Sequence, residues 1–506
     1  MRQFALRWLA LMIPLAIFFL FLSRNTSAYT TVNKIVVPGT LIAAATRISN
    51  EAGEDRHAPH VDDAKTIDIG PFWRKWSQIM YDARPDPTTT VQLRGTASIF
   101  EPSDPNASRK PYYDLVSNER ESLVSAIGRP HTRFVKELLE NIAGDESIFQ
   151  GRGIVMVGGG EYFGPAIVSI HMLRRAGCTL SVEVFVPDDD EYEVEVCESY
   201  LPKLNARCVV LAHILAQSSV DGAKLAIRHY QLKAPALLFS SFEEVLLLDS
   251  DSIPVADPTT DIFETEPYIS SGLIVWPDFW GATESPKFWS VVGVPGFPAN
   301  LPATSSEAGQ LVVNKRTHLA PLLLATYYNV FGHLYYPLLS QGALGQGDKE
   351  TFMAAAVVLN ATYYRVKTPV GNIGRDDGRS YRGTAMVQHL PSDDLAKSQG
   401  KPGTVRPAFL HSNTPKMNAG HLVDEGDLVS ADGKSRLRLL GSKSDQQKLF
   451  GFDLESSVWD LLVQTGCELA GVIRDWNSRK RLCDRLEEHH QKVFHDERQS
   501  PGGIYR

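Results

Sequence analysis

Two aspartates one residue apart, Asp249 and Asp251, stand at the end of an apolar run over residues 245–248. A valine followed by three leucines predicts a strand that is buried on both faces of a sheet. Ligands of open α/β sheets collect at the carboxyl ends of strands, where these carboxylates fall. Carboxylates this close need a cation or a shared proton, and hard oxygen ligands suit Mg²⁺ or Mn²⁺ together with phosphate oxygens. The pattern therefore predicts a metal-bridged diphosphate site.

A histidine and a lysine late in the chain fit the same chemistry. His411 ends an apolar run over residues 408–411 that predicts another strand, and Lys416 follows it. A lone histidine at a strand end is more often structural than a metal ligand. In a chain that also holds an Asp-x-Asp pattern, His411 becomes a candidate third metal ligand, and Lys416 a candidate cation for a leaving diphosphate.

Two further polar segments are candidates for contacts with a sugar. Glu307 and Gln310 belong to a polar bend that precedes a predicted strand over residues 311–314. Asp348 precedes a predicted helix over residues 352–359. An acidic first turn is also what the helix macrodipole favours, so a purely structural role for Asp348 is the alternative.

A cluster of glycines follows the first predicted strand of the body. A strand over residues 154–157, a helix over 165–176 and a strand over 182–186 predict a β-α-β unit, and hence a parallel sheet. Glycines after the first strand let a ligand approach the backbone closely, although a tight turn for packing would need them too. Phe163 stands where a dinucleotide-binding motif would have its third glycine, which favours a generic nucleotide-binding turn. The glycines are Gly158, Gly159 and Gly160.

The composition is that of an ordinary globular protein. Hydrophobic residues make up 43% of the 506 residues and charged residues 22%, and the formal net charge is −8. A negative net charge argues against a nucleic-acid partner. Five cysteines in this length make no disulfide scaffold. One or two disulfides with one thiol left over fit their spacing, and buried free thiols are an equally good interpretation.

The N-terminus predicts a membrane anchor. Residues 9–22 are uninterruptedly apolar, and Arg2 and Arg7 precede most of this run. The positive-inside rule then places residues 1–8 in the cytosol and the body in the lumen. A cleaved signal peptide is the competing interpretation, because residues 26–28 form a passable cleavage site. Both interpretations put the bulk of the chain in the secretory pathway.

The segments that flank the body differ in character. Residues 23–111 are rich in Pro, Asp and Thr and predict a stem, with one amphipathic island over 72–81 that could pack on the body. A helical lead-in follows, with helix predicted over 115–142 and an interruption near 128–130. The tail from residue 441 contains two helical patterns, over 454–465 and 467–486.

With these residues laid out, the sequence resembles the fungal Golgi α-mannosyltransferases of glycosyltransferase family 71, which include the yeast outer-chain α-1,2- and α-1,3-mannosyltransferases. The resemblance covers roughly residues 151–416. The Asp-x-Asp triplet alone is a weak signal, whereas an ordered series of blocks is a strong one. The blocks are 151–164, 230–251, 276–280, 307–315 and 347–352.

The resemblance implies an α/β fold of the GT-A type, a nucleotide-diphospho-sugar transferase fold with a mixed central sheet, preceded by a transmembrane helix and a stem. The implied organisation is a cytosolic tail (1–8), a type II signal anchor (9–22), a stem (23–111), a helical lead-in (112–150), a catalytic domain (151–440) and a C-terminal helical tail (441–506). The implied location is the Golgi membrane, with a lumenal catalytic domain and with other mannosyltransferases as partners in a complex.

The resemblance also implies roles for particular residues, with GDP-mannose as the donor, Mn²⁺ as the cofactor and an α-mannoside glycan as the acceptor. The metal ligands would be Asp249, Asp251 and His411. The residues beside the nucleotide and its diphosphate would be Gly158, Gly159, Gly160, Lys233 and Lys416. The residues facing the mannosyl group or the acceptor hydroxyl would be Glu307, Gln310 and Asp348.

The sequence therefore predicts a retaining α-mannosyltransferase that acts on an N-glycan outer chain or on cell-wall mannan. The block with Trp276 and Trp280 resembles that of the α-1,2 branch-adding members of the family, which implies α-1,2 transfer, and α-1,3 transfer is the alternative linkage. Two other functions compete with this prediction. One is a metal-dependent phosphohydrolase that uses the Asp-x-Asp pair, and the other is a non-catalytic lumenal subunit that binds mannan through the same fold.

Overall fold

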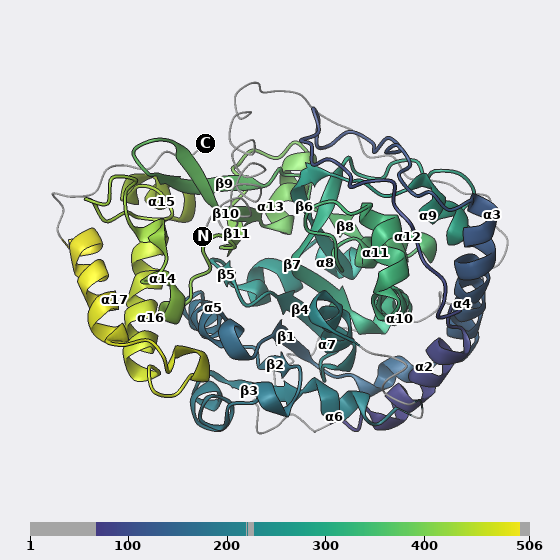
Figure 1. Ribbon diagram of the computed structural model, residues 1–506, viewed down its shortest axis with the longest axis horizontal. Helices are drawn as coiled ribbons and strands as arrows, with labels where there is room; N and C mark the ends of the chain where they lie inside the picture. The colour runs from purple at the N-terminus through teal and green to yellow at the C-terminus, as the bar shows by residue number, and fades with distance from the viewer. Residues whose placement is uncertain (1–66, 219, 221–226, 496–506) are drawn as a thin grey trace, which may run out of the picture.

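A computed structural model describes residues 67–218, 220 and 227–495, and its centre is a mixed seven-stranded sheet with the order β3-β2-β1-β4-β7-β6-β8 (Figure 1). The first four strands in this order run parallel, and β7 then pairs antiparallel with both β4 and β6. The strands are β1 (Arg152–Val157), β2 (Val182–Val186), β3 (Ala206–Val210), β4 (Glu244–Leu248), β6 (Leu273–Gly281), β7 (Thr304–Asn314) and β8 (Tyr364–Arg365).

Both faces of the parallel strands are covered, as the aliphatic run before Asp249 predicts. Alternate residues of β4 point to opposite faces, so that Leu246 and Leu248 belong to one hydrophobic cluster and Leu247 to the other. Helix α5 (Phe163–Arg175) contributes to the first cluster, and helices α7 (Lys233–Phe239) and α10 (Lys315–Val330) contribute to the second. The predicted β-α-β unit and the mixed α/β sheet are confirmed.

The antiparallel strands are longer than the sequence pattern suggests. Strand β7 covers Thr304–Asn314, so Glu307 and Gln310 lie on a strand and not in a bend before it. The polar half of β7 pairs with β6, and Trp276 lies opposite Glu307. The register of this pairing is irregular on either side of that position. Pairing with a neighbouring strand satisfies the backbone of a polar segment, and local sequence does not report that neighbour.

A second, four-stranded antiparallel sheet has the order β5-β11-β10-β9. Strand β5 follows the two aspartates directly and pairs with β11, so that His411 lies opposite Ser252. This pairing brings the end of β11 to the carboxyl end of β4. The strands are β5 (Ser252–Pro254), β9 (Gly371–Asp376), β10 (Tyr381–His389) and β11 (Pro407–His411).

The segment before the sheet packs on the body through aromatic side chains. Helix α2 (Gly70–Asp82) is the predicted amphipathic island, and its Trp73 and Trp76 are buried. The predicted helix over 115–142 begins only at Arg120 and consists of α3 (Arg120–Leu123), one π turn and α4 (Arg129–Asn141). Pro130 stands in the first turn of α4, where its missing N–H costs nothing.

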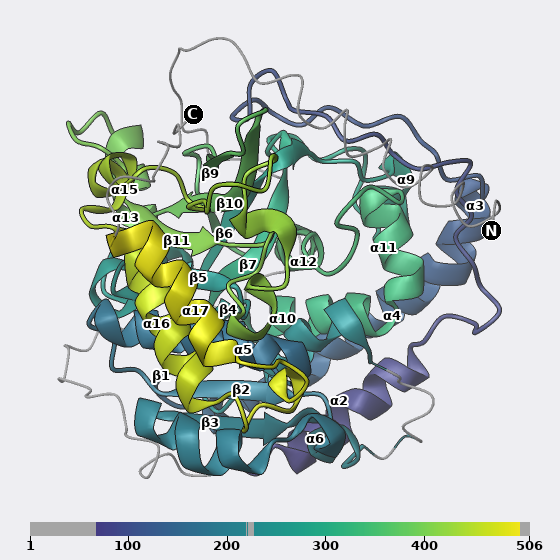
Figure 2. The same cartoon turned by 60° about the vertical axis from the view of Figure 1, so that its left-hand side comes forward.

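The C-terminal tail lies on the other side of the sheet from α2 and α4, beside α5 (Figures 1 and 2). Its helices are α15 (Lys443–Phe450), α16 (Leu454–Glu468) and α17 (Leu482–His490). The predicted helix over 467–486 is wrong at its start, because α16 runs on to Glu468 and a short turn over Arg474–Trp476 intervenes. A disulfide between Cys467 and Cys483 joins α16 to α17.

The remaining helices surround the sheet. Part of the segment over 286–302, which is rich in Pro and Gly, is the helix α9. These helices are α6 (Leu211–Leu215), α8 (Tyr268–Ser271), α9 (Pro286–Val291), α11 (Gly332–Ser340), α12 (Thr351–Val358), α13 (Pro391–Ser398) and α14 (Ala419–Leu422).

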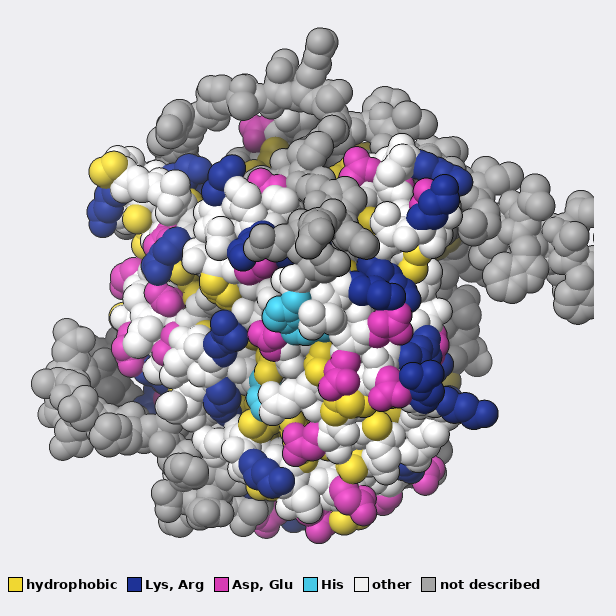
Figure 3. All heavy atoms as spheres, turned by 90° about the vertical axis from the view of Figure 1, so that its left-hand side faces the viewer, with side chains coloured by type: hydrophobic (Ala, Val, Ile, Leu, Met, Phe, Trp, Pro, Cys, Tyr) yellow, Lys and Arg dark blue, Asp and Glu magenta, His cyan; other side chains and the backbone are white. Residues whose placement is uncertain are grey.

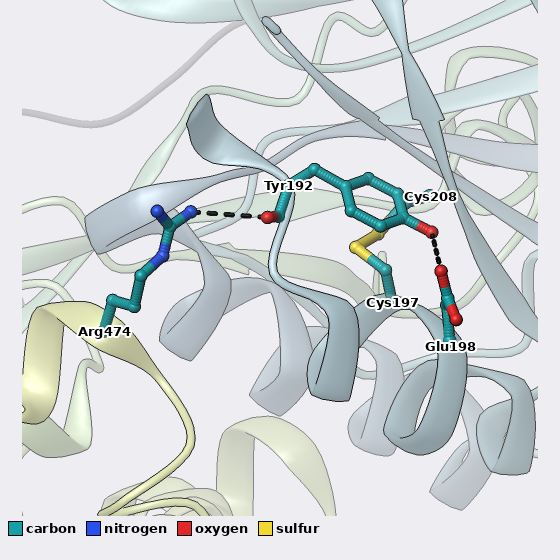
Figure 4. The surroundings of a disulfide bond; sticks show 5 residues. All are labelled: Tyr192, Cys197, Glu198, Cys208 and Arg474. Atoms are coloured by element: carbon teal, nitrogen blue, oxygen red, sulfur yellow. Dashed lines mark hydrogen bonds between the residues drawn. A yellow bond between two sulfur atoms is a disulfide. The ribbon is translucent and has the colours of Figure 1, made fainter. Parts of the chain in front are cut away.

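A second disulfide stabilises the edge of the sheet. Cys197 and Cys208 are bonded, and among the described residues Cys178 is the free, buried thiol. Figure 4 shows this disulfide beside Tyr192, whose carbonyl accepts a hydrogen bond from Arg474 of the tail (3.4 Å). The tail therefore also holds the β2–β3 edge.

None of the helices among the described residues is both long enough and apolar enough to cross a membrane. The predicted anchor over 9–22 and the cytosolic tail over 1–8 lie outside the described residues, as does the stem up to residue 66.

Candidate active site

The carboxyl end of β4 carries the two aspartates in a short turn. The backbone N–H of Asp249 donates to the carbonyl of Gly309 on β7 (2.8 Å), and Ser252 N–H donates to the carbonyl of Asp249 (3.0 Å). These bonds end β4, turn the chain into β5 and leave both carboxylates at the strand end. Asp251 is 3% exposed, so its charge must be compensated within the protein.

Asp249, Asp251 and His411 form the triad that the sequence predicts. One ligand atom from each lies within 4.8 Å of the others. The imidazole Nε2 of His411 lies 3.2 Å from Oδ1 of Asp251, and its Nδ1 lies 3.3 Å from Oε1 of Glu307 without hydrogen-bond alignment. Two carboxylates and an imidazole are a donor set that fits Mn²⁺ or a similar divalent ion.

Two lysines neutralise the aspartates. The Nζ of Lys233 donates to Oδ2 of Asp249 (2.7 Å) and to the carbonyl of Ala308 (3.1 Å), and Lys416 pairs with Oδ2 of Asp251. Burial alone would lower the pKa of Lys233, but Asp249 and Asp348 raise it above its ordinary value. Lys233 is therefore charged throughout the physiological range.

The two aspartates respond to these neighbours differently. Burial raises the pKa of Asp249, and Lys233 opposes that shift. Burial also acts to raise the pKa of Asp251, but His411 and Lys416 together lower it below its ordinary range. Asp251 is thus the more firmly ionised of the pair.

Glu307, Gln310 and Asp348 converge on the same centre. Burial raises the pKa of Asp348 to about 6, although Lys233 counteracts it. Burial would raise the pKa of Glu307 as well, but His411 lowers it to about 2. Oδ2 of Asp348 and Nε2 of Gln310 are buried without a hydrogen-bond partner, and Nζ of Lys233 is too far from that Oδ2, at 3.9 Å, for a hydrogen bond. Buried polar atoms without a partner are available for hydrogen bonds to a ligand or to water.

The glycine turn lies at the carboxyl end of β1 and serves packing in the first place. Gly159 and Gly160 have positive φ angles of 105° and 48°, and a Cβ on Gly158 would lie 2.6 Å from Val184. No bond joins the three glycines to the metal triad among the described residues. The turn leads to Tyr162, whose ring lies 5.7 Å from Nζ of Lys416. Within the part of the chain that the structure describes, the glycine turn is therefore connected to the site through Tyr162 and not by a bond to the metal triad.

A second buried ion pair lies beside the site and was not predicted from the sequence. Nζ of Lys349 donates to Oδ2 of Asp278 (2.7 Å), and burial raises the pKa of Asp278. Both residues stand in blocks that carry the family resemblance, Asp278 between Trp276 and Trp280 and Lys349 beside Asp348. A carboxylate and a lysine that are far apart in the sequence can be recognised as an ion pair only after the fold shows that they are in contact.

One face of the molecule carries charges of both signs. Figure 3 shows that basic and acidic side chains are interspersed on it, without a large area of one sign.

Comparison with known proteins identifies relatives of this chain. A family model described as "Mannosyltransferase putative" matches residues 151–300 and 296–390. An α-1,2-mannosyltransferase of Candida albicans, MNN21, is 32% identical, and the match covers 88% of this chain and 78% of that protein. The α-1,2-mannosyltransferase MNN2 of Saccharomyces cerevisiae is 37% identical over 53% of this chain and 50% of its own length.

Two glycosyltransferases of solved structure match parts of this chain. GlyE of Streptococcus pneumoniae is 15% identical, with a TM-score of 0.27, and the match covers 43% of this chain and 45% of that one. An active-site mutant of LgtC is 15% identical, with a TM-score of 0.26, over 43% and 72% of the two chains.

The family model and the fungal relatives define the protein, with its α/β sheet, as a glycosyltransferase. More narrowly, the chain belongs to the mannosyltransferase family of these fungal relatives.

Proposed function

We propose that the chain transfers mannose from GDP-mannose to a hydroxyl of an α-mannoside glycan, with Mn²⁺ as the cofactor and with retention of the α configuration. The observation that carries this proposal is the buried triad Asp249, Asp251 and His411 with a lysine on either side. The proposed linkage is α-1,2, because relatives such as MNN21 and MNN2 are named α-1,2-mannosyltransferases. A GT-A fold is part of the same proposal.

The donor side of the reaction needs compensation for a departing diphosphate. Asp249, Asp251 and His411 would hold Mn²⁺, which supplies a Lewis acid for the phosphate oxygens. Lys233 and Lys416 add positive charge that is in position before the bond breaks. Both lysines are bonded to aspartates at the strand end, so no reorganisation of the chain is needed to present them.

The sugar side of the reaction needs negative charge and hydrogen bonds near the anomeric carbon. A centre of oxocarbenium character develops as the glycosidic bond breaks, and a nearby carboxylate stabilises it. We assign this role to Asp348, and its buried Oδ2, which lacks a hydrogen-bond partner, supports the assignment. Glu307 and Gln310 would bind hydroxyls of the mannosyl group or of the acceptor.

We further propose that the protein works in the Golgi lumen, held by a type II anchor over residues 9–22 and assembled with other mannosyltransferases. The bonds Cys197–Cys208 and Cys467–Cys483 support a lumenal site, because disulfides persist in oxidising compartments. The run of apolar residues at the N-terminus supports the anchor.

The test uses the full-length protein in detergent with labelled GDP-mannose, Mn²⁺ and an α-1,6-linked mannan. We expect label in the polymer, loss of transfer with a chelator, and α-1,2 linkages by NMR of the product. Release of free mannose without elongation would instead identify a hydrolase. Calorimetry that detects mannan binding but no Mn²⁺-dependent binding of GDP-mannose would identify a lectin-like subunit.

A further inference from the structure

A segment that precedes the sheet lies across the far end of β6 and β7. This segment, residues 84–119, is called the strap here. Gly281 N–H donates to the carbonyl of Phe100 (2.8 Å), and Ala303 N–H donates to the carbonyl of Ala107 (3.0 Å). In Figure 1 the strap connects α2 with α3 and passes over the top of the molecule.

A buried ion pair fixes the strap in place. An Nη of Arg109 lies 2.8 Å from Oε2 of Glu284, and both side chains are almost fully buried. Arg109 also donates to the carbonyls of Pro302 (2.8 Å) and Thr304 (3.2 Å). Breaking a buried pair of this kind is strongly destabilising, so the strap is a fixed part of the body.

The strap presents three stacked aromatic rings to solvent, which are called the aromatic column here. Phe100 packs on the backbone of Gly281 and stacks on Tyr112 with ring centroids 5.8 Å apart and planes at 15°. Tyr112 stacks on Tyr113 with centroids 4.2 Å apart. Phe100 is 39% exposed and Tyr113 is 61% exposed. Exposed apolar side chains gathered in this way mark binding surfaces more often than chance does.

The edges of the aromatic column are polar. The hydroxyl of Tyr112 donates to the hydroxyl of Tyr113 (2.9 Å) and accepts from the N–H of Ser98 (3.0 Å). A surface with flat apolar faces and hydroxyl edges matches a ligand with the same alternation, and a pyranose ring has an apolar C–H face and hydroxyl edges. Tyrosines also supply contact area at a low cost in conformational entropy.

A small recess lies between the strap and the chain next to Asp348. Ile99 of the strap lines it together with Trp280, Gly281, Lys349 and Glu350. Gly281 is the residue on which Phe100 packs, and Lys349 is adjacent to Asp348 in the chain. The strap that carries the aromatic column therefore lies beside the segment of Asp348, on the side of the proposed acceptor.

We propose that the aromatic column binds mannose residues of the acceptor beyond the one that receives the new linkage, so that the enzyme prefers extended mannosides. This proposal rests on the proposed mannosyl transfer. The strap thereby becomes a recognition element for a neutral oligosaccharide, and the ion pair of Arg109 with Glu284 keeps it in position.

The test compares acceptors of increasing length, from α-mannobiose to α-mannohexaose. We expect kcat/KM of the wild-type enzyme to rise with length, and Tyr113→Ala to lose about tenfold on the long acceptors with the mannobiose rate unchanged, which corresponds to a contact of ordinary size. Tyr113→Phe keeps the ring and should retain most of the preference. Leu139→Ala, at another exposed apolar side chain (58%), is the matched control and should behave as wild type.

A binding measurement without donor separates this proposal from the proposed function. Calorimetry with α-mannohexaose should give binding that Tyr113→Ala weakens about tenfold, whether or not transfer occurs. Binding without any transfer would support the column and contradict the transferase. Equal kcat/KM and equal binding in wild type and Tyr113→Ala would overturn the column. A loss confined to glycoprotein acceptors would also overturn it, because it would identify the peptide as the ligand.

Discussion

The proposed donor half and the proposed acceptor half of the site differ in the kind of side chains that form them. The donor half lies at the end of the parallel strands and consists of buried charges of both signs, such as Asp251 and Lys416. The acceptor half lies over the antiparallel strands β6 and β7 and ends in the exposed rings of the strap. A diphosphate needs charges that are fixed before it arrives, whereas a neutral glycan needs faces and hydrogen bonds.

Each half is also braced by a segment outside the span 151–390 that the family model matches. The strap, anchored by Arg109, braces the acceptor half. The C-terminal tail braces the donor half, because Nε1 of Trp476 donates to the side chain of Asn418 (3.0 Å), which in turn donates to the carbonyl of Glu161 (2.9 Å). Asn418 closely follows Lys416, so the tail supports both the lysine loop and the glycine turn.

The largest effect is expected at the centre of the donor half. Asp251→Asn keeps the shape of the side chain and removes its charge, so the metal and Lys416 both lose their partner. Transfer should fall about 10³-fold or more, as for loss of a principal catalytic group. Transfer assays at saturating Mn²⁺ and metal binding by electron paramagnetic resonance measure the two consequences. Asp484→Asn, an exposed carboxylate of the tail, is the control. Full activity in Asp251→Asn would remove the metal assignment.

A smaller effect in the same half is expected from Lys416→Met. This change removes one positive charge while Lys233 remains, so kcat should fall about 10²-fold. The KM for a short acceptor should stay the same, because Lys416 faces the donor side. Steady-state kinetics measure the split, with the exposed Lys434→Met as the control. A change in the KM for the acceptor without a change in kcat would contradict the assignment of Lys416 to the donor half.

The contact of Trp476 with Asn418 should affect activity because it positions the loop of Lys416, and not because it changes the charge of the site. Trp476→Phe keeps most of the packing and removes the bond to Asn418, so the loop of Lys416 loses one of its supports. We expect kcat/KM for GDP-mannose to fall about tenfold, since small misplacements at a site are costly. The preference for long acceptors should be unchanged. An equal loss of that preference would show that the tail serves both halves.

A change in pH is expected to have the smallest effect on the chemistry, and to change the stability of the protein through a buried histidine outside the site. His131 of α4 is buried against Tyr328 of α10, and burial lowers its pKa to about 3. The unfolded chain binds a proton near pH 6.5, so the contribution of this residue is complete above that pH and is lost as the pH falls toward 3.

The free energy of unfolding should therefore drop by about 2 kcal/mol on account of His131 between pH 7 and pH 5. Urea unfolding at the two pH values measures the drop. The variant His131→Asn, which does not titrate, should show a correspondingly smaller difference. An identical difference in both proteins would contradict the assignment to this histidine.

Local sequence predicted the elements where the side-chain pattern is local. The aliphatic run of β4, the short apolar strands β1 and β2, and the aromatic face of α2 are each visible over a few residues, because burial on one or both faces selects apolar side chains locally. The polar half of β7 was missed. Glu307 and Gln310 look like a bend until β6 supplies the partner for their backbone.

The sequence by itself determined the parts of the donor half: two aspartates after a buried strand, a histidine and lysine after another, and the relationship to a mannosyltransferase family. Only the tertiary structure decided that they meet, through the pairing of β5 with β11 that sets His411 beside Asp251. The strap and its aromatic column were also decided there. Such contacts join residues more than a hundred positions apart, and their register depends on packing between elements that no local pattern records.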